Sequence, residues 1–233
     1  MTFLFWDIDG TLLTTGRAGI IAWEDACRAI TQQTLDFQNL KTDGLTDHQV
    51  AMSIMAHARH QAADADLARM VQCYEDRLPA RLHERKGRVL EGVREALEYF
   101  RDHRRDIHSM LLTGNTEAGA RAKLAHYGLA GFFEGGAFSI DSGPRATIAT
   151  RALQAIHAKF PDERIEPHRV FVIGDTPHDI DCAKAIDARA IAVATGVYSA
   201  ADLRAHGAWR VFDRVPPPHQ LTALIEDGDK LKN

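Results

Sequence analysis

The stretch FLFWDIDGTL at residues 3–12 decides the fold of this chain. Its first four residues are large and apolar with no helical spacing, which is typical of a strand buried on both faces of a parallel sheet. Asp7 follows at the carboxyl end of this predicted strand, the edge at which open α/β sheets bind ligands. Asp9 lies two residues further on, so both carboxylates can point to the same side, and Gly10 lets the backbone turn beneath a ligand.

The two aspartates permit two interpretations. Paired carboxylates suit a divalent hard cation, and they also suit a division of labour in which one attacks while the other moves a proton. The alternative is an ordinary Asp-Gly turn whose carboxylates are only solvated. Residues further along the chain must decide between them.

The segment from residue 14 to residue 87 is predicted to be helical. Apolar residues recur at helical spacing over residues 20–33, 47–59 and 64–82, and no strand pattern interrupts them. Because this block follows the first strand directly, we expect a helical domain inserted at residues 14–87.

Strand and helix patterns alternate through the rest of the chain. Strands are expected at residues 107–112, 170–173, 190–193 and 209–212, with a short one within 132–140. Helices are expected at residues 92–103, 116–127, 146–160 and 177–186. Such alternation predicts an α/β fold whose parallel strands are joined by right-handed crossovers.

Polar residues of a definite kind follow the predicted strands. Thr113-Gly114-Asn115 can form a neutral donor nest for a phosphate oxygen, and Asp175 can complete a metal site with Asp7. Asp179 lies one helical turn after Asp175, and Arg145 offers a cation for the same anion. Since the carboxyl ends of parallel strands meet at one edge, we expect these groups to converge.

Each of these residues also has a purely structural explanation. Thr113 and Asn115 can cap a helix, Asp175 can serve a turn, and Asp179 can complement a helix dipole. Arg145 can be a surface charge. Their occurrence together, in this order, favours the functional interpretation.

At this point the chain resembles the haloacid dehalogenase superfamily, and most closely its phosphoglycolate phosphatase-like group with a helical C1-type cap. The motifs that carry the resemblance are DIDGT at residues 7–11, Thr113, Arg145 and GDTPHD at residues 174–179. The resemblance implies a Rossmann-like core of residues 1–13 and 88–233 and a cap domain of residues 14–87. It also implies a cap that opens and closes over the site.

The resemblance further implies a phosphatase mechanism. Asp7 would be the nucleophile that forms an aspartyl-phosphate, and Asp9 would be the acid and then the base. Mg²⁺ would be held by Asp7, the backbone carbonyl of Asp9 and Asp175, with Asp179 steadying the metal. The groups that would bind the phosphoryl group are Gly10, Thr113, Gly114, Asn115 and Arg145.

Departures from the family pattern keep alternatives open. The usual basic residue is a lysine, whereas Arg145 stands here, and Lys123, the only nearby lysine, lies within a predicted helix. Asp9 favours phosphate-ester hydrolysis over dehalogenation. Sugar-phosphate mutases of this fold carry an arginine in the cap loop, where this chain has Gly44-Leu45-Thr46-Asp47. A mutase, or a non-catalytic member that binds phosphate or a partner, is therefore the alternative.

The cap residues that would choose the substrate are Arg17, Lys41 and Thr46, because they lie in loops beside the predicted helices. A helix-capping Thr46 and solvated Arg17 and Lys41 are the competing explanation. The substrate expected is a small phosphorylated molecule such as phosphoglycolate.

The composition of the chain limits the binding partners and the cellular compartment that we expect. The chain has 233 residues and a formal net charge of −4, which argues against a broad nucleic-acid surface. Its three cysteines are odd in number and widely spaced, which favours a reducing cytoplasm over a disulfide framework. No apolar run approaches the roughly 20 residues that span a bilayer. The sequence does not indicate an oligomeric state.

Overall fold

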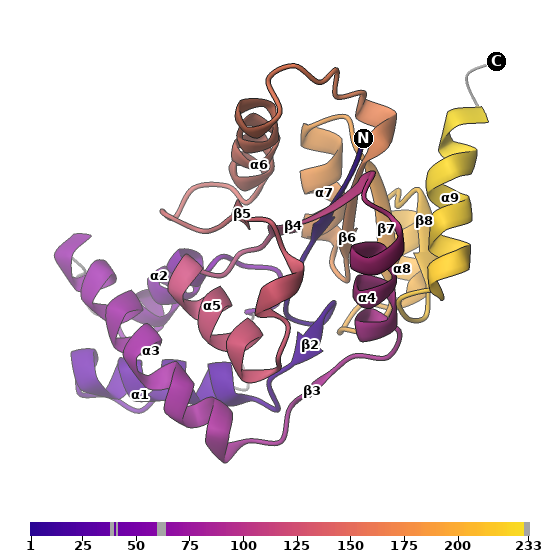
Figure 1. Cartoon of the computed structure of the whole chain (residues 1–233). Coiled ribbons are helices and arrows are strands. Elements are labelled where there is room, and N and C mark those ends of the chain that lie inside the picture. Colours follow the sequence, from indigo (N-terminus) through magenta and orange to yellow (C-terminus); the bar gives the residue numbers. More distant parts are fainter. Residues whose placement is uncertain (38–39, 41, 60–63, 231–233) are drawn as a thin grey trace.

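The computed structural model describes residues 1–37, 40, 42–59 and 64–230. Six parallel strands form one sheet in the order β5-β4-β1-β6-β7-β8 (Figure 1). The strands are β1 (Thr2–Trp6), β4 (Ile107–Leu112), β5 (Gly136–Ala137), β6 (Val170–Gly174), β7 (Arg189–Val193) and β8 (Arg210–Phe212). The predicted α/β fold is therefore confirmed.

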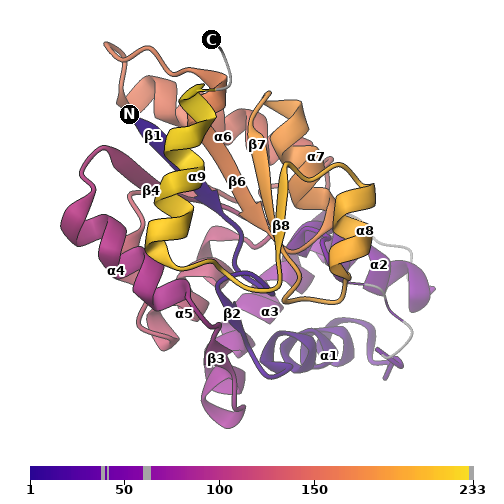
Figure 2. The same ribbon diagram turned by 90° about the vertical axis from the view of Figure 1, so that its right-hand side faces the viewer.

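Helices cover both faces of the sheet (Figure 2). One face packs against α4 (Val93–His103), α5 (Glu117–His126) and α9 (Pro218–Lys230). The other packs against α6 (Ala146–Lys159), α7 (Pro177–Ala185) and α8 (Ala200–Ala205). Strand β1 serves both layers, since Leu4 and Trp6 enter the first cluster while Phe3 and Phe5 enter the second. This explains why its residues from Phe3 to Trp6 are all apolar.

Three helices lie between β1 and the rest of the sheet in sequence, and we call them the inserted helices: α1 (Ala18–Thr31), α2 (Asp47–His57) and α3 (Asp64–Glu84). They form their own apolar cluster, in which the rings of Trp23 and Tyr74 stack at a centroid distance of 4.0 Å. A two-stranded antiparallel ribbon, β2 (Leu13–Thr14) with β3 (Arg88–Val89), connects them to the core. This arrangement supports the division at residues 14–87, and we propose that the segment is a separate cap domain.

The sequence patterns missed the C-terminal helix α9, although it has 13 residues, and they also missed several short elements. Strands β2 and β3 have two residues each, and α8 has six, too few for a hydrophobic period to be recognised. Two 3₁₀ turns, Ala130–Phe132 and Pro167–Arg169, were missed for the same reason. None of the helices in the described part of the chain is both long and apolar enough to cross a membrane.

The central sheet should depend strongly on the aromatic side chains buried in it. Phe171 on β6 is fully buried and packs against Trp209 at a centroid distance of 5.8 Å. We expect Phe171→Ala to lower the free energy of unfolding by about 3–5 kcal/mol, because it leaves a cavity. Urea unfolding would measure the loss, with the exposed Met52→Ala as the control. Equal losses in both variants would contradict this packing.

Candidate active site

The register of the central strands brings the predicted site residues together. Trp6, the last residue of β1, pairs with Leu111 on one side and with Ile173 on the other. Asp7 follows Trp6 directly, and its N–H donates to the Ile173 carbonyl at 2.9 Å. The loops that begin after β4 and β6 therefore flank the residues after β1.

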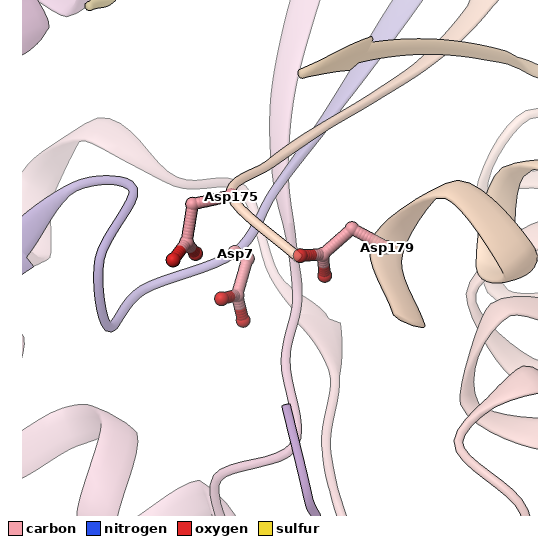
Figure 3. A group of neighbouring side chains, drawn as sticks. All are labelled: Asp7, Asp175 and Asp179. Carbon is pink, nitrogen blue, oxygen red and sulfur yellow. The ribbon is translucent and has the colours of Figure 1, made fainter. Parts of the chain in front are cut away.

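Three of the four predicted metal residues form a compact carboxylate cluster. Oxygens of Asp7, Asp175 and Asp179 lie within 4.8 Å of one another, and all three residues are buried. Figure 3 shows the three carboxylates gathered where the ends of two strands meet the start of a helix. We call this group the carboxylate cluster.

Local sequence holds the cluster in place. Thr176 is the N-cap of α7, where its hydroxyl and N–H both donate to Asp179 Oδ2, at 2.8 and 3.0 Å. The Thr11 hydroxyl donates to Asp175 Oδ1 at 3.1 Å. Gly10 is needed beside Asp175, since a Cβ there would lie 2.3 Å from Asp175 Oδ2. Because Gly10 has no side chain, the Asp175 carboxylate can lie against the turn at Gly10.

Arg145 is the buried cation of the cluster. Its Nη2 lies 2.9 Å from Asp7 Oδ1 and 2.5 Å from Asp179 Oδ1. Its Nη1 donates to the carbonyl of Gly44, in the loop before α2, at 3.0 Å. Arg145 thus joins the predicted nucleophile to the segment that carries the inserted helices.

The carboxylate cluster holds more negative charge than Arg145 balances. Burial raises the pKa of Asp7 to about 7, with Arg145 opposing the rise and Asp179 adding to it. Burial and the carboxylates of Asp179 and Asp7 likewise raise the pKa of Asp175 well above its usual range. Three buried carboxylates against one guanidinium fit a bound divalent cation, which takes oxygen ligands and supplies the missing positive charge.

Asp9 lies outside this cluster and has its own cation. Lys123 Nζ lies 2.6 Å from Asp9 Oδ2 and 2.6 Å from Asn115 Oδ1. The Asn115 amide donates to Asp9 Oδ2 at 2.9 Å and to the Thr113 hydroxyl at 2.7 Å. Lys123 is not among the predicted site residues. The signal was available, since Lys123 shares a helix face with the small or apolar, buried residues Gly119, Ala120 and Leu124.

The loop after β4 touches both the site and the inserted helices. Thr113 is fully buried, and its hydroxyl favours the charged form of Asp7, which lowers the Asp7 pKa. The Gly114 carbonyl accepts from the N–H of Asp47 at 2.8 Å, and Asp47 Oδ2 accepts from the N–H of Thr116 at 2.8 Å. A Cβ on Gly114 would lie 2.7 Å from the Leu45 carbonyl oxygen, so this close contact requires glycine.

The three predicted substrate-binding residues of the inserted segment differ in position. Thr46 is buried and its hydroxyl accepts from the N–H of Gln49 at 3.2 Å, so this oxygen is engaged in capping α2. Arg17 is exposed and lines the cavity described below. Lys41 lies outside the described residues.

A cavity of about 550 Å³ separates this edge of the sheet from the inserted helices. Asp7, Asp9, Lys123 and Arg145 are among its lining residues on the core side. The inserted segment contributes apolar walls, including Ile20, Leu45, Val50 and the stacked pair Trp23 and Tyr74. Both carboxylates of the DIDGT stretch therefore line the same cavity.

Removal of the Arg145 guanidinium should destabilise the folded protein, because it leaves the negative charge of the carboxylate cluster unbalanced. In metal-free buffer at pH 7.5, we expect Arg145→Met to lower the free energy of unfolding by about 3–5 kcal/mol, because buried carboxylates lose their partner. Arg145→Lys should lose less, since it keeps the charge. Chemical denaturation measures both, with the exposed Arg105→Met as a matched control. A fully stable Arg145→Met would show that this cation does not compensate the cluster.

The raised pKa of Asp7 also predicts a pH dependence. Its value rises from 3.8 to about 7 on folding, so the metal-free folded protein binds more protons than the unfolded chain between these values. Stability without metal should therefore fall as pH rises from about 4 to about 7. Added Mg²⁺ needs the ionised carboxylates, so it should raise the melting temperature more at pH 7.5 than at pH 5.5. Asp7→Asn should reduce this difference, and an equal metal effect at both pH values would contradict the assignment.

Comparisons with known proteins identify the family and the fold of the chain. The family model described as haloacid dehalogenase-like hydrolase matches residues 4–184. A hydrolase from Pseudomonas syringae has a similar structure, with a TM-score of 0.72, 20% identity, and coverage of 97% of this chain and 99% of that chain. A predicted phosphatase from Clostridium acetobutylicum gives 0.72 at 18% identity, covering 97% of this chain and 98% of that chain.

A third similar structure is CbbY from Rhodobacter sphaeroides in complex with phosphate. Its TM-score is 0.71 at 20% identity, and the match covers 92% of this chain and 95% of that chain. No curated protein matched the chain. At these identities the solved structures show a shared fold, whereas the family model spans most of the sequence. The chain therefore belongs to the haloacid dehalogenase-like hydrolases.

Proposed function

We propose that this protein hydrolyses a small-molecule phosphate monoester with the help of Mg²⁺. One observation carries the proposal: Asp7 and Asp9 face the same cavity but lie in different electrostatic settings. Asp7 belongs to the carboxylate cluster with Arg145, whereas Asp9 is held apart by Lys123 and Asn115. Two carboxylates in contrasting environments suit one nucleophile and one proton-transfer group.

Structural relatives support the choice of phosphate chemistry. CbbY binds phosphate in one solved structure and, as a variant, xylulose-(1,5)bisphosphate in another. The second match has a TM-score of 0.71 at 19% identity. We propose a phosphorylated small molecule as the substrate of this chain as well, with phosphoglycolate as the first compound to test.

The metal in this proposal is held by Asp7, Asp175 and the backbone carbonyl of Asp9. Asp179 steadies the group, because its oxygens already accept from Arg145 and Thr176. When bound, Mg²⁺ neutralises charge on the transferring phosphoryl group and orients it.

The chain's own residues perform the covalent steps. An oxygen of Asp7 attacks phosphorus, forming an aspartyl-phosphate as the bond from phosphorus to the leaving oxygen breaks, and Asp9 gives that oxygen a proton. Asp9 then takes a proton from water as the water oxygen attacks the same phosphorus, which frees Asp7 and inorganic phosphate. Thr113, Gly114, Asn115, Gly10 and Arg145 surround the phosphoryl group in this proposal.

Cap movement belongs to the same proposal. The ribbon formed by β2 and β3 joins the inserted helices to the core, so it is the natural hinge. Opening would admit the substrate, and closing would exclude bulk water from the cavity. A cytoplasmic location is also proposed, and the three free cysteines fit it.

Phosphate release from a panel of phosphomonoesters tests the function. We expect turnover by the wild type that needs Mg²⁺, and a loss on the order of 10³-fold or more in Asp7→Asn, which lacks the nucleophile. Asp213→Asn, an exposed position, is the matched control.

Other outcomes would favour the alternatives. Metal-dependent interconversion of sugar phosphates without net phosphate release would favour a mutase. A folded protein that binds Mg²⁺ and phosphate but turns over no ester would favour a binding role. Equal activity in Asp7→Asn and the wild type would remove Asp7 from the mechanism.

A further inference from the structure

Lys123 is a buried ammonium that the proposed mechanism does not yet use. It lies in α5 and is 4% exposed. Its Nζ lies 2.6 Å from Asp9 Oδ2 and 2.6 Å from Asn115 Oδ1. A lysine buried this deeply is retained only when its charge is paired and hydrogen-bonded.

The Asp9 carboxylate is anchored on one side only. Both hydrogen bonds that it accepts, from Lys123 and from the Asn115 amide, end on Oδ2. Within the described residues, no donor reaches its other oxygen, Oδ1. The Asp9 side chain is 45% exposed and lines the cavity, so one oxygen is fixed while the other is free to meet a ligand.

Arg145 does not supply this anchor. Its guanidinium contacts Asp7, Asp179 and the Gly44 carbonyl. The two buried cations therefore serve different carboxylates, with Arg145 at the predicted nucleophile and Lys123 at the predicted acid. Asn115 extends the anchor to Thr113 through its amide, 2.7 Å from the Thr113 hydroxyl.

We propose that Lys123 is a positioning residue that, together with Asn115, fixes Asp9 so that its free oxygen faces the leaving oxygen of the substrate. This inference rests on the proposed phosphatase function. The role of Lys123 is geometric, because a proton donor contributes only within hydrogen-bond reach of the atom it protonates.

The chemistry of the leaving group makes this role measurable. An alkyl phosphate releases a poor leaving group, whose oxygen needs a proton as the bond to phosphorus breaks. A nitrophenyl phosphate releases a stable phenolate that needs little help. A misplaced Asp9 should therefore slow hydrolysis of the alkyl phosphate much more than hydrolysis of the nitrophenyl phosphate. General damage to the site should slow hydrolysis of both esters.

The experiment compares kcat/KM for an alkyl phosphate from the panel with kcat/KM for p-nitrophenyl phosphate, using enzyme with Mg²⁺. We expect Lys123→Met to lower the alkyl value by about 100-fold, the scale of general acid catalysis, and the nitrophenyl value by less than about tenfold. Lys123→Arg should recover part of the alkyl activity. Arg121→Met removes an exposed cation from the same helix and should change neither value.

A double-mutant comparison separates positioning from other roles. In an Asp9→Asn background, Lys123→Met should cost little further alkyl activity, because the group that Lys123 positions is already disabled. If Lys123→Met does not fold, Lys123→Gln keeps a hydrogen-bond donor without the charge and takes its place in both comparisons.

Three results would overturn the inference. Equal loss for both esters would assign Lys123 to general structure or phosphoryl binding, and unchanged activity would remove it from the reaction. Additive losses with Asp9→Asn would show that it acts elsewhere. In each case a wild type that still needs Asp7 leaves the proposed function intact, whereas a wild type that hydrolyses neither ester refutes the function and this inference together.

Discussion

The burial of several carboxylates at one sheet edge is the constraint on which this structure depends. Parallel pairing of β1 with β4 and β6 forces the groups after these strands into one place. Like charges that are removed from water repel strongly, so each must be balanced nearby. Arg145 balances part of the negative charge of the carboxylate cluster. Because negative charge remains in excess, a divalent cation fits there.

The two buried cations also give Asp7 and Asp9 different surroundings. Asp7 and Asp9 are neighbours in sequence, yet their partners come from different elements, Arg145 at the start of α6 and Lys123 within α5. The separation lets one carboxylate belong to the carboxylate cluster while the other stays half-exposed in the cavity. The proposed nucleophile and acid thus differ because of their surroundings rather than their residue type.

Most long elements could be predicted from sequence, since strands such as residues 3–6 and 170–173 are apolar throughout and the helices between them are periodic. The exception is α9 (Pro218–Lys230), for which no helix was predicted. The two-residue strands β2 and β3 could not be predicted, because pairing rather than pattern defines them. Thr46 shows a limit of another kind. Helix capping was the competing explanation for this residue, and the structure confirms it, with Gln49 completing a capping box. The pattern of Gly119, Ala120 and Leu124 could have placed Lys123 on the buried face of α5, but its contact with Asp9 depends on how α5 packs against the core.

The hydrogen bond between Asp47 and Thr116 offers a way to measure the proposed opening of the cavity. The Thr116 N–H precedes α5 and finds its acceptor on α2, a helix of the inserted segment. Burial raises the pKa of Asp47 to about 6, so this carboxylate gains hydration whenever the contact separates. The amide of Thr116 is then protected from solvent only while α2 stays docked. If the cap moves as proposed, the hydrogen-exchange rate of this amide reports the fraction of time during which the cap and the core are apart. The readout is a single backbone position and needs no substrate.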